Sequence, residues 1–230
     1  MSGHQSRFII KTDSADPPHG GMPVSTGGSP IETAGLVFIL LHGRGGNARE
    51  MLALAEHFEC PDAAFVAPQA AGFSWYPASF IAPFEVNQPG IDSAHKVIES
   101  LIDSIAVGRS SPAPIALLGF SQGACLAVDH AYRFPRRYAF IAGLTGGIIG
   151  PPGTDFDRDG ALNGTPVFLG SGDPDPHVPW SRVRESARVL EGMGGNVELV
   201  GYENAPHAVL PDQVDRVREL ARAATVGGSA

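Results

Sequence analysis

The sequence predicts a doubly wound α/β fold, in which a mostly parallel sheet carries helices on both faces. Strand-like apolar runs alternate with helical patterns through most of the chain. Several runs, such as residues 36–41, are apolar at every position, as expected for strands buried on both faces of a parallel sheet. No internal repeat and no long linker interrupts this alternation, so we expect a single domain over residues 1–230.

The first 35 residues fit this alternation least well. A short apolar patch around Phe8 predicts an edge strand within residues 1–11. Residues 12–35 are rich in Gly, Pro, Ser and Thr, so we expect a flexible surface loop or a ragged hairpin there. The patch around Phe8 is far shorter than the core of a signal peptide. No run approaches the roughly 20 apolar residues that a membrane span needs, and we expect a cytoplasmic protein without membrane insertion.

The other elements are expected in a regular order. Apolar runs predict strands at residues 36–41, 63–67, 115–118, 138–144, 167–170 and 196–202. Helical spacing, the N-cap residue Asn47 and a proline at the first turn of the last helix predict helices at residues 48–58, 91–105, 124–134, 180–190 and 211–224. Residues 69–90 are expected to be irregular. Ligands on such sheets bind at the carboxyl ends of the strands, so the loops that follow the strands are expected to carry the chemistry.

The composition excludes several classes of partner. The net charge is −8 with scattered acidic residues, which argues against nucleic acid or an anionic membrane as the main partner. A hydrophobic content of 43% and a mean hydropathy of +0.02 indicate a globular protein. The two cysteines, Cys60 and Cys125, imply neither a disulfide nor a metal site, and most histidines lack the spacing of metal ligands.

The pentapeptide Gly119-Phe120-Ser121-Gln122-Gly123 stands between a predicted strand and a predicted helix. A strand that turns sharply into a helix leaves the central serine exposed at the crest, in the arrangement called a nucleophile elbow. The serine takes a strained backbone conformation there, and Gly119 and Gly123 lack side chains that would collide across the turn. The pentapeptide alone is a weak signal, but its context is the required one. We therefore predict that Ser121 is a nucleophile.

A serine hydroxyl needs a base to take its proton and an acid to orient that base. His207 follows the last predicted strand, and Asp173 and Asp175 follow the strand before it. The order Ser, Asp, His is that of the α/β-hydrolase fold. Asp173 lies nearer the strand end, and we expect its carboxylate to accept N–H groups of its own turn. Asp175 lies further out, where it can reach His207.

The loop after residues 36–41 begins with His42-Gly-Arg-Gly. Its glycines let the backbone turn so that an N–H group points at a developing oxyanion, and the second donor is expected to be the N–H of Gln122. We expect His42 to hold this loop by a hydrogen bond rather than to transfer a proton.

The irregular stretch 69–90 is expected to form the substrate pocket. Trp75 and Tyr76 belong either to the core or to the pocket wall, and their place in an irregular segment near the strand ends favours the wall. We predict that they and Phe80 line a stiff apolar wall. Such a wall favours short or medium acyl chains, because each buried methylene gains only ~0.8 kcal/mol and only where space exists for it. His177 is expected at the surface or at the pocket rim.

These motifs resemble those of the phospholipase/carboxylesterase family, the group of α/β-hydrolases that includes acyl-protein thioesterases. The resemblance covers roughly residues 36–220. It rests on five motifs in the order of the family: Leu-His-Gly-Arg-Gly (41–45), Ser-Trp-Tyr (74–76), Gly-Phe-Ser-Gln-Gly-Ala (119–124), Gly-Asp-Pro-Asp-Pro-His-Val-Pro (172–179) and His207. Five motifs in order are far more specific than any one of them.

The resemblance implies a role for each site residue. Ser121 corresponds to the nucleophile, His207 to the general base and acid, and Asp175 to the orienting acid. The backbone amides of Arg44 and Gln122 correspond to the oxyanion hole. The expected activity is that of a carboxylesterase, which cleaves small-molecule esters through an acyl-enzyme and requires no cofactor or metal. The resemblance is also compatible with a homodimer.

Three alternatives use the same fold. An acyl-thioesterase would share the machinery and differ in the pocket. The thioesterase branch has an acidic residue where this chain has Gly46, and residues 74–90 look more like small bacterial carboxylesterases, so an ester is the expected substrate. A dienelactone-type hydrolase normally has Cys where this chain has Ser121. A non-catalytic binding module would have lost a member of the triad, and none is missing.

Overall fold

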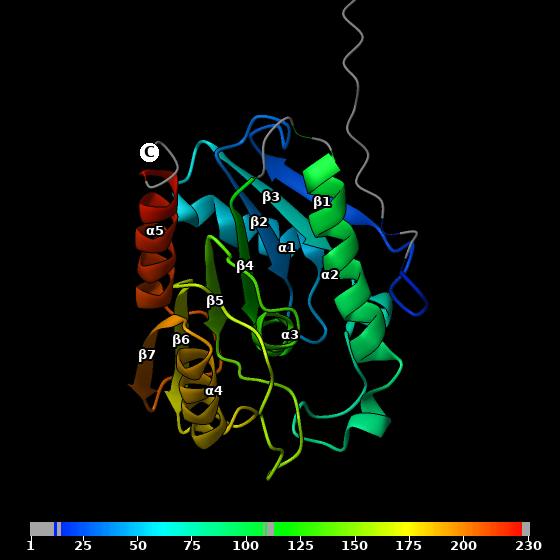
Figure 1. Cartoon of the computed structure of the whole chain (residues 1–230), viewed down its shortest axis with the longest axis vertical. Helices are drawn as coiled ribbons and strands as arrows, with labels where there is room; N and C mark the ends of the chain where they lie inside the picture. The colour runs from blue at the N-terminus through cyan, green and yellow to red at the C-terminus, as the bar shows by residue number, and fades with distance from the viewer. Residues whose placement is uncertain (1–11, 13–14, 108, 110–112, 227–230) are drawn as a thin grey trace, which may run out of the picture.

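The computed structural model describes residue 12 and residues 15–107, 109 and 113–226 (Figure 1). Within these residues, seven strands form one sheet in the order β1-β3-β2-β4-β5-β6-β7. The strands are β1 (Val24–Gly28), β2 (Leu36–Leu41), β3 (Ala63–Pro68), β4 (Ile115–Phe120), β5 (Phe140–Leu144), β6 (Pro166–Asp173) and β7 (Asn196–Glu203). Only the pairing of β1 with β3 is antiparallel; the other neighbouring pairs run parallel.

Helices cover both faces of this sheet. They are α1 (Ala48–Ala55), α2 (Gly90–Val107), α3 (Gln122–Arg133), α4 (Trp180–Gly192) and α5 (Pro211–Val226). In Figure 1, α2, α3 and α4 lie in front of the sheet and α1 lies behind it. Three short 3₁₀ turns are η1 (Glu56–Phe58), η2 (Ala71–Phe73) and η3 (Phe84–Asn87). The predicted doubly wound fold, with helices on both faces, is confirmed.

The strand β2 shows why its residues are apolar at every position. Leu36, Phe38 and Leu40 pack with α1 and α5, whereas Val37, Ile39 and Leu41 pack with α2, α3 and α4. All six side chains are fully buried. Successive residues of a strand point to opposite faces, so a strand between two helix layers needs apolar residues on both.

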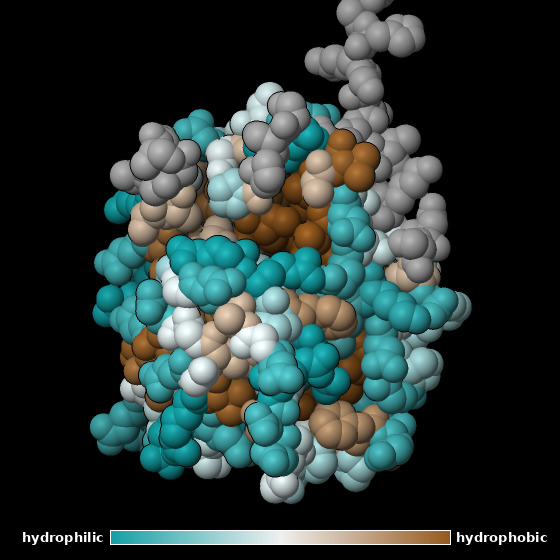
Figure 2. Space-filling model, in the orientation of Figure 1, coloured by the Kyte–Doolittle hydropathy of each residue, from teal (hydrophilic) through white to brown (hydrophobic). Residues whose placement is uncertain are grey.

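On the outer surface, hydrophilic side chains cover most of the face in Figure 2 and apolar ones show only in separate areas.

The N-terminal segment differs from its prediction. The stretch around Phe8 lies outside the described residues, and the observed edge strand is β1, which falls in the expected loop. Nearby, the side chain of His19 is buried and accepts the N–H of Ala71 at 3.1 Å. The expectation of a flexible surface loop is therefore wrong here. Strand pairing uses backbone groups that every residue carries, so Val-Ser-Thr-Gly-Gly pairs with β3 without an apolar pattern.

The carboxyl ends of the central strands position the site. β6 runs three residues further than predicted, because the backbone of residues 171–173 pairs with β7. Residues 69–89 contain only the short turns η2 and η3, as expected of an irregular stretch, and α2 begins at Gly90. Among the described helices, none is both long and apolar enough to cross a bilayer.

Candidate active site

The turn between β4 and α3 holds Ser121 in a strained conformation. Its backbone has φ 54° and ψ −116°, a region that non-glycine residues rarely occupy and that costs on the order of 1–3 kcal/mol. A Cβ atom at Gly119 would lie 2.1 Å from the carbonyl oxygen of Gly123, and one at Gly123 would lie 2.1 Å from that of Leu41. Both glycines are thus required for the close approach of backbone to backbone, as predicted. The geometry is that of a nucleophile elbow.

Three side chains from three strand ends form one hydrogen-bonded chain. Ser121 Oγ lies 2.8 Å from Nε2 of His207, and Nδ1 of His207 lies 2.8 Å from Oδ2 of Asp175. The other carboxylate oxygen of Asp175 accepts the N–H groups of His177 and Val178 at 2.8 and 2.9 Å. The His207 side chain is 18% exposed and that of Asp175 only 1%. A neutral imidazole of His207 donates a hydrogen bond to Asp175 through Nδ1 and accepts one from the Ser121 hydroxyl at Nε2.

Two carboxylates of this loop take different places. Asp173 is the last residue of β6, and its carbonyl oxygen accepts the N–H of Asn204 at 3.1 Å. The expectation that the carboxylate of Asp173 accepts N–H groups of its own turn is wrong, because β6 continues through Asp173 and the turn begins after it. The carboxylate of Asp175 accepts the N–H groups of that turn instead. Burial by itself raises the pKa of Asp175, but the hydrogen bond from His207 and those from two backbone N–H groups hold that pKa below its ordinary value.

The two predicted oxyanion donors flank the serine. Gln122 is the first residue of α3, so its N–H has no acceptor within the helix. Arg44 lies in the loop after β2, where a Cβ on the adjacent Gly43 would stand 3.4 Å from the Cβ of Ser121. No acceptor among the described residues takes the N–H of Arg44 or of Gln122. Both N–H groups are therefore without a protein acceptor in the described part of the chain.

His42 contacts the loop that follows it and lies apart from the hydrogen-bonded chain. Its Nδ1 lies 2.7 Å from the carbonyl oxygen of Gly43, and its Nε2 accepts the N–H of Ala70 at 3.1 Å. Burial lowers the pKa of His42, which favours the neutral ring that these two bonds require. The contact agrees with the expectation that His42 holds this loop.

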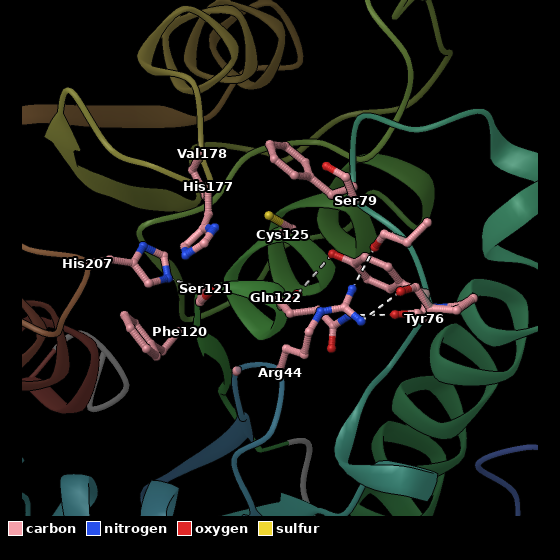
Figure 3. A pocket seen from close by; sticks show the side chains of 14 residues that line it. Arg44, Tyr76, Ser79, Phe120, Ser121, Gln122, Cys125, His177, Val178 and His207 are labelled. Atoms are coloured by element: carbon pink, nitrogen blue, oxygen red, sulfur yellow. Dashed lines mark hydrogen bonds between the residues drawn. The ribbon is translucent and has the colours of Figure 1, made fainter.

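A hollow of about 610 Å³ opens beside Ser121 (Figure 3). It is lined by Gly43, Arg44, Tyr76, Pro77, Ala78, Ser79, Phe80, Phe120, Ser121, Gln122, Cys125, His177, Val178 and His207. Tyr76, Phe80 and the rim residue His177 lie where they were predicted. Cys125 was missed; it lies in the first turn of α3, where its N–H donates to the carbonyl oxygen of Ser121 at 2.9 Å, and this places it beside the serine. Burial raises the pKa of Cys125 to about 12, so the wall presents a neutral thiol.

The prediction that Trp75 lines this pocket is wrong. Its side chain is fully buried, and its indole N–H donates to the carbonyl oxygen of His42 at 2.9 Å. The ring packs against the rings of His19 and His42, with centroid distances of 5.3 and 5.0 Å. Two segments distant in sequence enclose this tryptophan, and no local pattern reports such an enclosure.

Known proteins share this architecture. A family model described as phospholipase/carboxylesterase matches residues 28–224. Acyl-protein thioesterase 1 of Saccharomyces cerevisiae is 27% identical over 206 residues, which are 80% of this chain and 91% of that protein. Acyl-protein thioesterase 1 of Gibberella zeae is 31% identical over 137 residues, and the match spans 56% of this chain and 54% of that protein. A crystal structure of a phospholipase/carboxylesterase from Dyadobacter fermentans is 39% identical with a TM-score of 0.83, covering 88% of this chain and 97% of that one.

Proposed function

Because the chain belongs to the phospholipase/carboxylesterase family and is an esterase-type hydrolase, we propose that it cleaves small-molecule carboxylic esters through an acyl-enzyme on Ser121. The observation that supports this most directly is the unbroken chain from Ser121 Oγ through His207 to Asp175, with 2.8 Å at both steps. It ends at a strained turn beside an open hollow. Nucleophile, base and orienting acid in this geometry serve acyl transfer.

The proposed reaction has two halves. Nε2 of His207 takes the Ser121 proton while Oγ attacks the ester carbonyl, and the oxyanion accepts the N–H groups of Arg44 and Gln122. The imidazolium then gives its proton to the departing alcohol, which leaves an acyl-Ser121. A water molecule repeats the attack with His207 as base and releases the carboxylic acid. Asp175 holds the imidazole in the required tautomer throughout.

The pocket supports a preference for short or medium acyl chains. Tyr76, Phe80 and Val178 are almost fully buried and form walls of the 610 Å³ hollow, so they have little freedom to move aside for a longer chain. We expect butyryl esters to turn over faster than palmitoyl esters, measured below the concentration at which the long esters form micelles. Faster turnover of the palmitoyl ester would overturn this preference.

A thioester substrate is the second candidate, because two relatives are named acyl-protein thioesterases. The proposed machinery attacks either carbonyl. Oxygen and sulfur esters with the same acyl group separate the candidates: a higher kcat/KM for the oxygen ester supports the carboxylesterase, and the reverse ranking supports the thioesterase.

A fluorophosphonate probe tests the covalent step. We expect one probe per chain, attached to the peptide that contains Ser121, and parallel loss of ester hydrolysis. The Ser121→Ala variant is the control and should take up no probe. Labelling of another residue, or full activity after complete labelling elsewhere, would contradict the proposed nucleophile.

We also propose that the enzyme works in the cytoplasm. Both cysteines are free thiols, Cys125 buried and Cys60 half-buried, which fits a reducing compartment. Fractionation of the source cells checks the location.

The family resemblance is compatible with a homodimer. The proposed chemistry does not require one, because a single chain supplies every residue of the site.

A further inference from the structure

One short segment, residues 74–78, contacts both residues that carry the proposed oxyanion donors. Its residues 76–78 line the pocket, and the whole segment is 30 or more positions away in sequence from Arg44 and from Gln122. The guanidinium of Arg44 donates to Ser74 Oγ at 3.1 Å and to the carbonyl oxygens of Pro77 and Ala78 at 2.8 and 2.6 Å. Figure 3 shows the guanidinium turned toward this wall, beside Tyr76. Its planar fork thus holds the segment at three points.

The side-chain amide of Gln122 holds the same segment from the other side. Its Oε1 accepts the N–H of Trp75 at 2.9 Å, and its Nε2 donates to the carbonyl oxygen of Tyr76 at 2.8 Å. One end of the amide meets a donor and the other an acceptor, which determines its orientation. The phenol of Tyr76 also lies 3.4 Å from the backbone carbonyl oxygen of Gln122.

The hydroxyl of Ser74 stands between these two side chains. It donates to the carbonyl oxygen of Tyr76 at 2.8 Å. It accepts from Arg44 at 3.1 Å and from Nε2 of Gln122 at 3.2 Å. A hydroxyl has one proton and two lone pairs, so these three bonds use its whole capacity. Ser74 therefore joins the side chains of the two proposed donors through a single oxygen atom.

The loop of Arg44 needs such support. Glycines precede and follow Arg44, and Gly45 has a φ of +77°, so within the Gly-Arg-Gly turn only Arg44 has a side chain that can hold it. Gly45 is tied to the same wall, since its N–H donates to the carbonyl oxygen of Phe73 at 2.7 Å. Oxyanion donors act only within about 2.7–3.1 Å of the place where the charge develops. A small shift of this loop relative to α3 would therefore weaken the hole.

We propose that Ser74 is a positioning residue that sets the spacing of the two oxyanion donors by joining the side chains of Arg44 and Gln122. This rests on the proposed function, because it assumes that the N–H groups of these residues hold the oxyanion. The donors bind the negative oxygen of the transition state more strongly than the neutral carbonyl of the substrate. Removal of the Ser74 hydroxyl should therefore lower kcat and leave KM nearly unchanged.

The test is the Ser74→Ala variant with short esters. We expect kcat to fall about 10- to 100-fold with KM within threefold of wild type. An alkyl boronic acid forms a tetrahedral adduct on the serine. Its inhibition constant should rise by about the same factor by which kcat/KM falls. Ser74→Thr keeps the hydroxyl and should recover most of the activity.

Ser186→Ala is the matched control. The hydroxyl of Ser186 also donates to a carbonyl oxygen, that of Arg182 at 2.7 Å, and accepts an N–H, that of Ile148 at 2.8 Å. This serine lies on α4, away from the loop of Arg44, so its loss should lower stability and leave kcat within twofold. If Ser74→Ala does not fold, Arg44→Met removes the hydrogen bond between Arg44 and Ser74 from the other partner. This variant should show the same loss of kcat.

The outcomes separate the two proposals. If wild type neither hydrolyses esters nor reacts with a fluorophosphonate, the proposed function fails. If wild type is active and Ser74→Ala keeps its kcat, or loses activity through KM alone, only the positioning role is overturned. Unchanged boronic acid affinity in a slow Ser74→Ala variant would overturn it as well.

Discussion

Of the histidine–carboxylate pairs at helix α3, two differ most clearly in their surroundings. The first is His207 with Asp175, 2.8 Å apart, at the N-terminal end of α3. The second is His95, from α2, with Asp129, from the middle of α3, 2.9 Å apart. Judged by the distance between nitrogen and oxygen alone, the two pairs are alike.

The second pair belongs to a closed polar cluster, the α2–α3 cluster, formed by His95, Glu99, Asp129, His130, Arg133 and Arg136. The side chains of Asp129 and His130 are fully buried. Asp129 also accepts from Arg133 at 2.6 Å and from the N–H of Ile149 at 3.2 Å. Each polar group of the cluster thus meets another protein group, as buried polar atoms require.

What faces the second nitrogen of each imidazole makes the difference. Nε2 of His207 faces Ser121 Oγ, which stands on a strained turn beside an open hollow. Nδ1 of His95 faces Nδ1 of His130 at 3.1 Å, inside the core. His207 thus faces the proposed nucleophile, whereas the α2–α3 cluster joins two helices. A histidine–carboxylate pair therefore indicates catalysis only where a nucleophile and an accessible hollow accompany it.

The largest effects should come from Ser121 and His207, which share one hydrogen bond of the proposed triad. Ser121→Ala and His207→Ala should each lower kcat by about 10⁴-fold or more, and the double variant should be little worse than either single one. In the α2–α3 cluster, His95→Gln should keep kcat within a few-fold and lower the melting temperature. Steady-state kinetics on all four variants measures this. Losses that add across Ser121 and His207, or a comparable loss in His95→Gln, would erase the distinction between the two pairs.

The carboxylates should separate in the same way. Asp175→Asn should lower kcat by about 10⁴-fold, because the amide mispositions the imidazole tautomer. Asp129→Asn should instead lower the free energy of unfolding by roughly 1–3 kcal/mol, since it weakens the buried acceptor of Arg133 and His95. Its kcat should change little. Kinetics and urea unfolding on both variants provide the comparison.

Asp173→Asn is the control for the loop that carries Asp175. Its carboxylate takes no hydrogen bond among the described residues, so both kcat and stability should stay close to wild type. Inactive Asp173→Asn together with active, folded Asp175→Asn would reverse the assignment of the orienting acid.

The smallest effect concerns the pH dependence of stability. The pKa of Asp175 is lowered in the folded protein, so its carboxylate stabilises the fold fully above the ordinary pKa of about 3.9 and progressively less as the pH falls through the folded pKa. Wild type should exceed Asp175→Asn in stability by about 1–2 kcal/mol at pH 7, and the gap should narrow below about pH 4. Urea unfolding of both proteins between pH 7 and 3 measures the gap; a gap that widens on acidification has the wrong sign.

Much of the site follows from local sequence patterns. A run that is apolar at every position has one stable place, between two helix layers, so β2 and β4 were predictable. Gly119 and Gly123 mark a turn that only glycines permit, and that turn identified Ser121. The order of Ser121, Asp175 and His207 along alternating strands brought their loops to one edge of the sheet. Each of these inferences depends on a residue and its immediate neighbours in the chain.

Other features depended on contacts that only the folded chain makes. β1 pairs through backbone groups, which leave no pattern in the side chains. Trp75 is buried because His19 and His42 enclose it from two distant segments. The choice of Asp175 over Asp173 as acceptor of the turn N–H groups follows from how far β6 continues beside β7. Likewise, the bonds of Ser74 to Arg44 and Gln122 arise only once two loops meet the N-terminus of α3, because each residue alone resembles an ordinary polar residue.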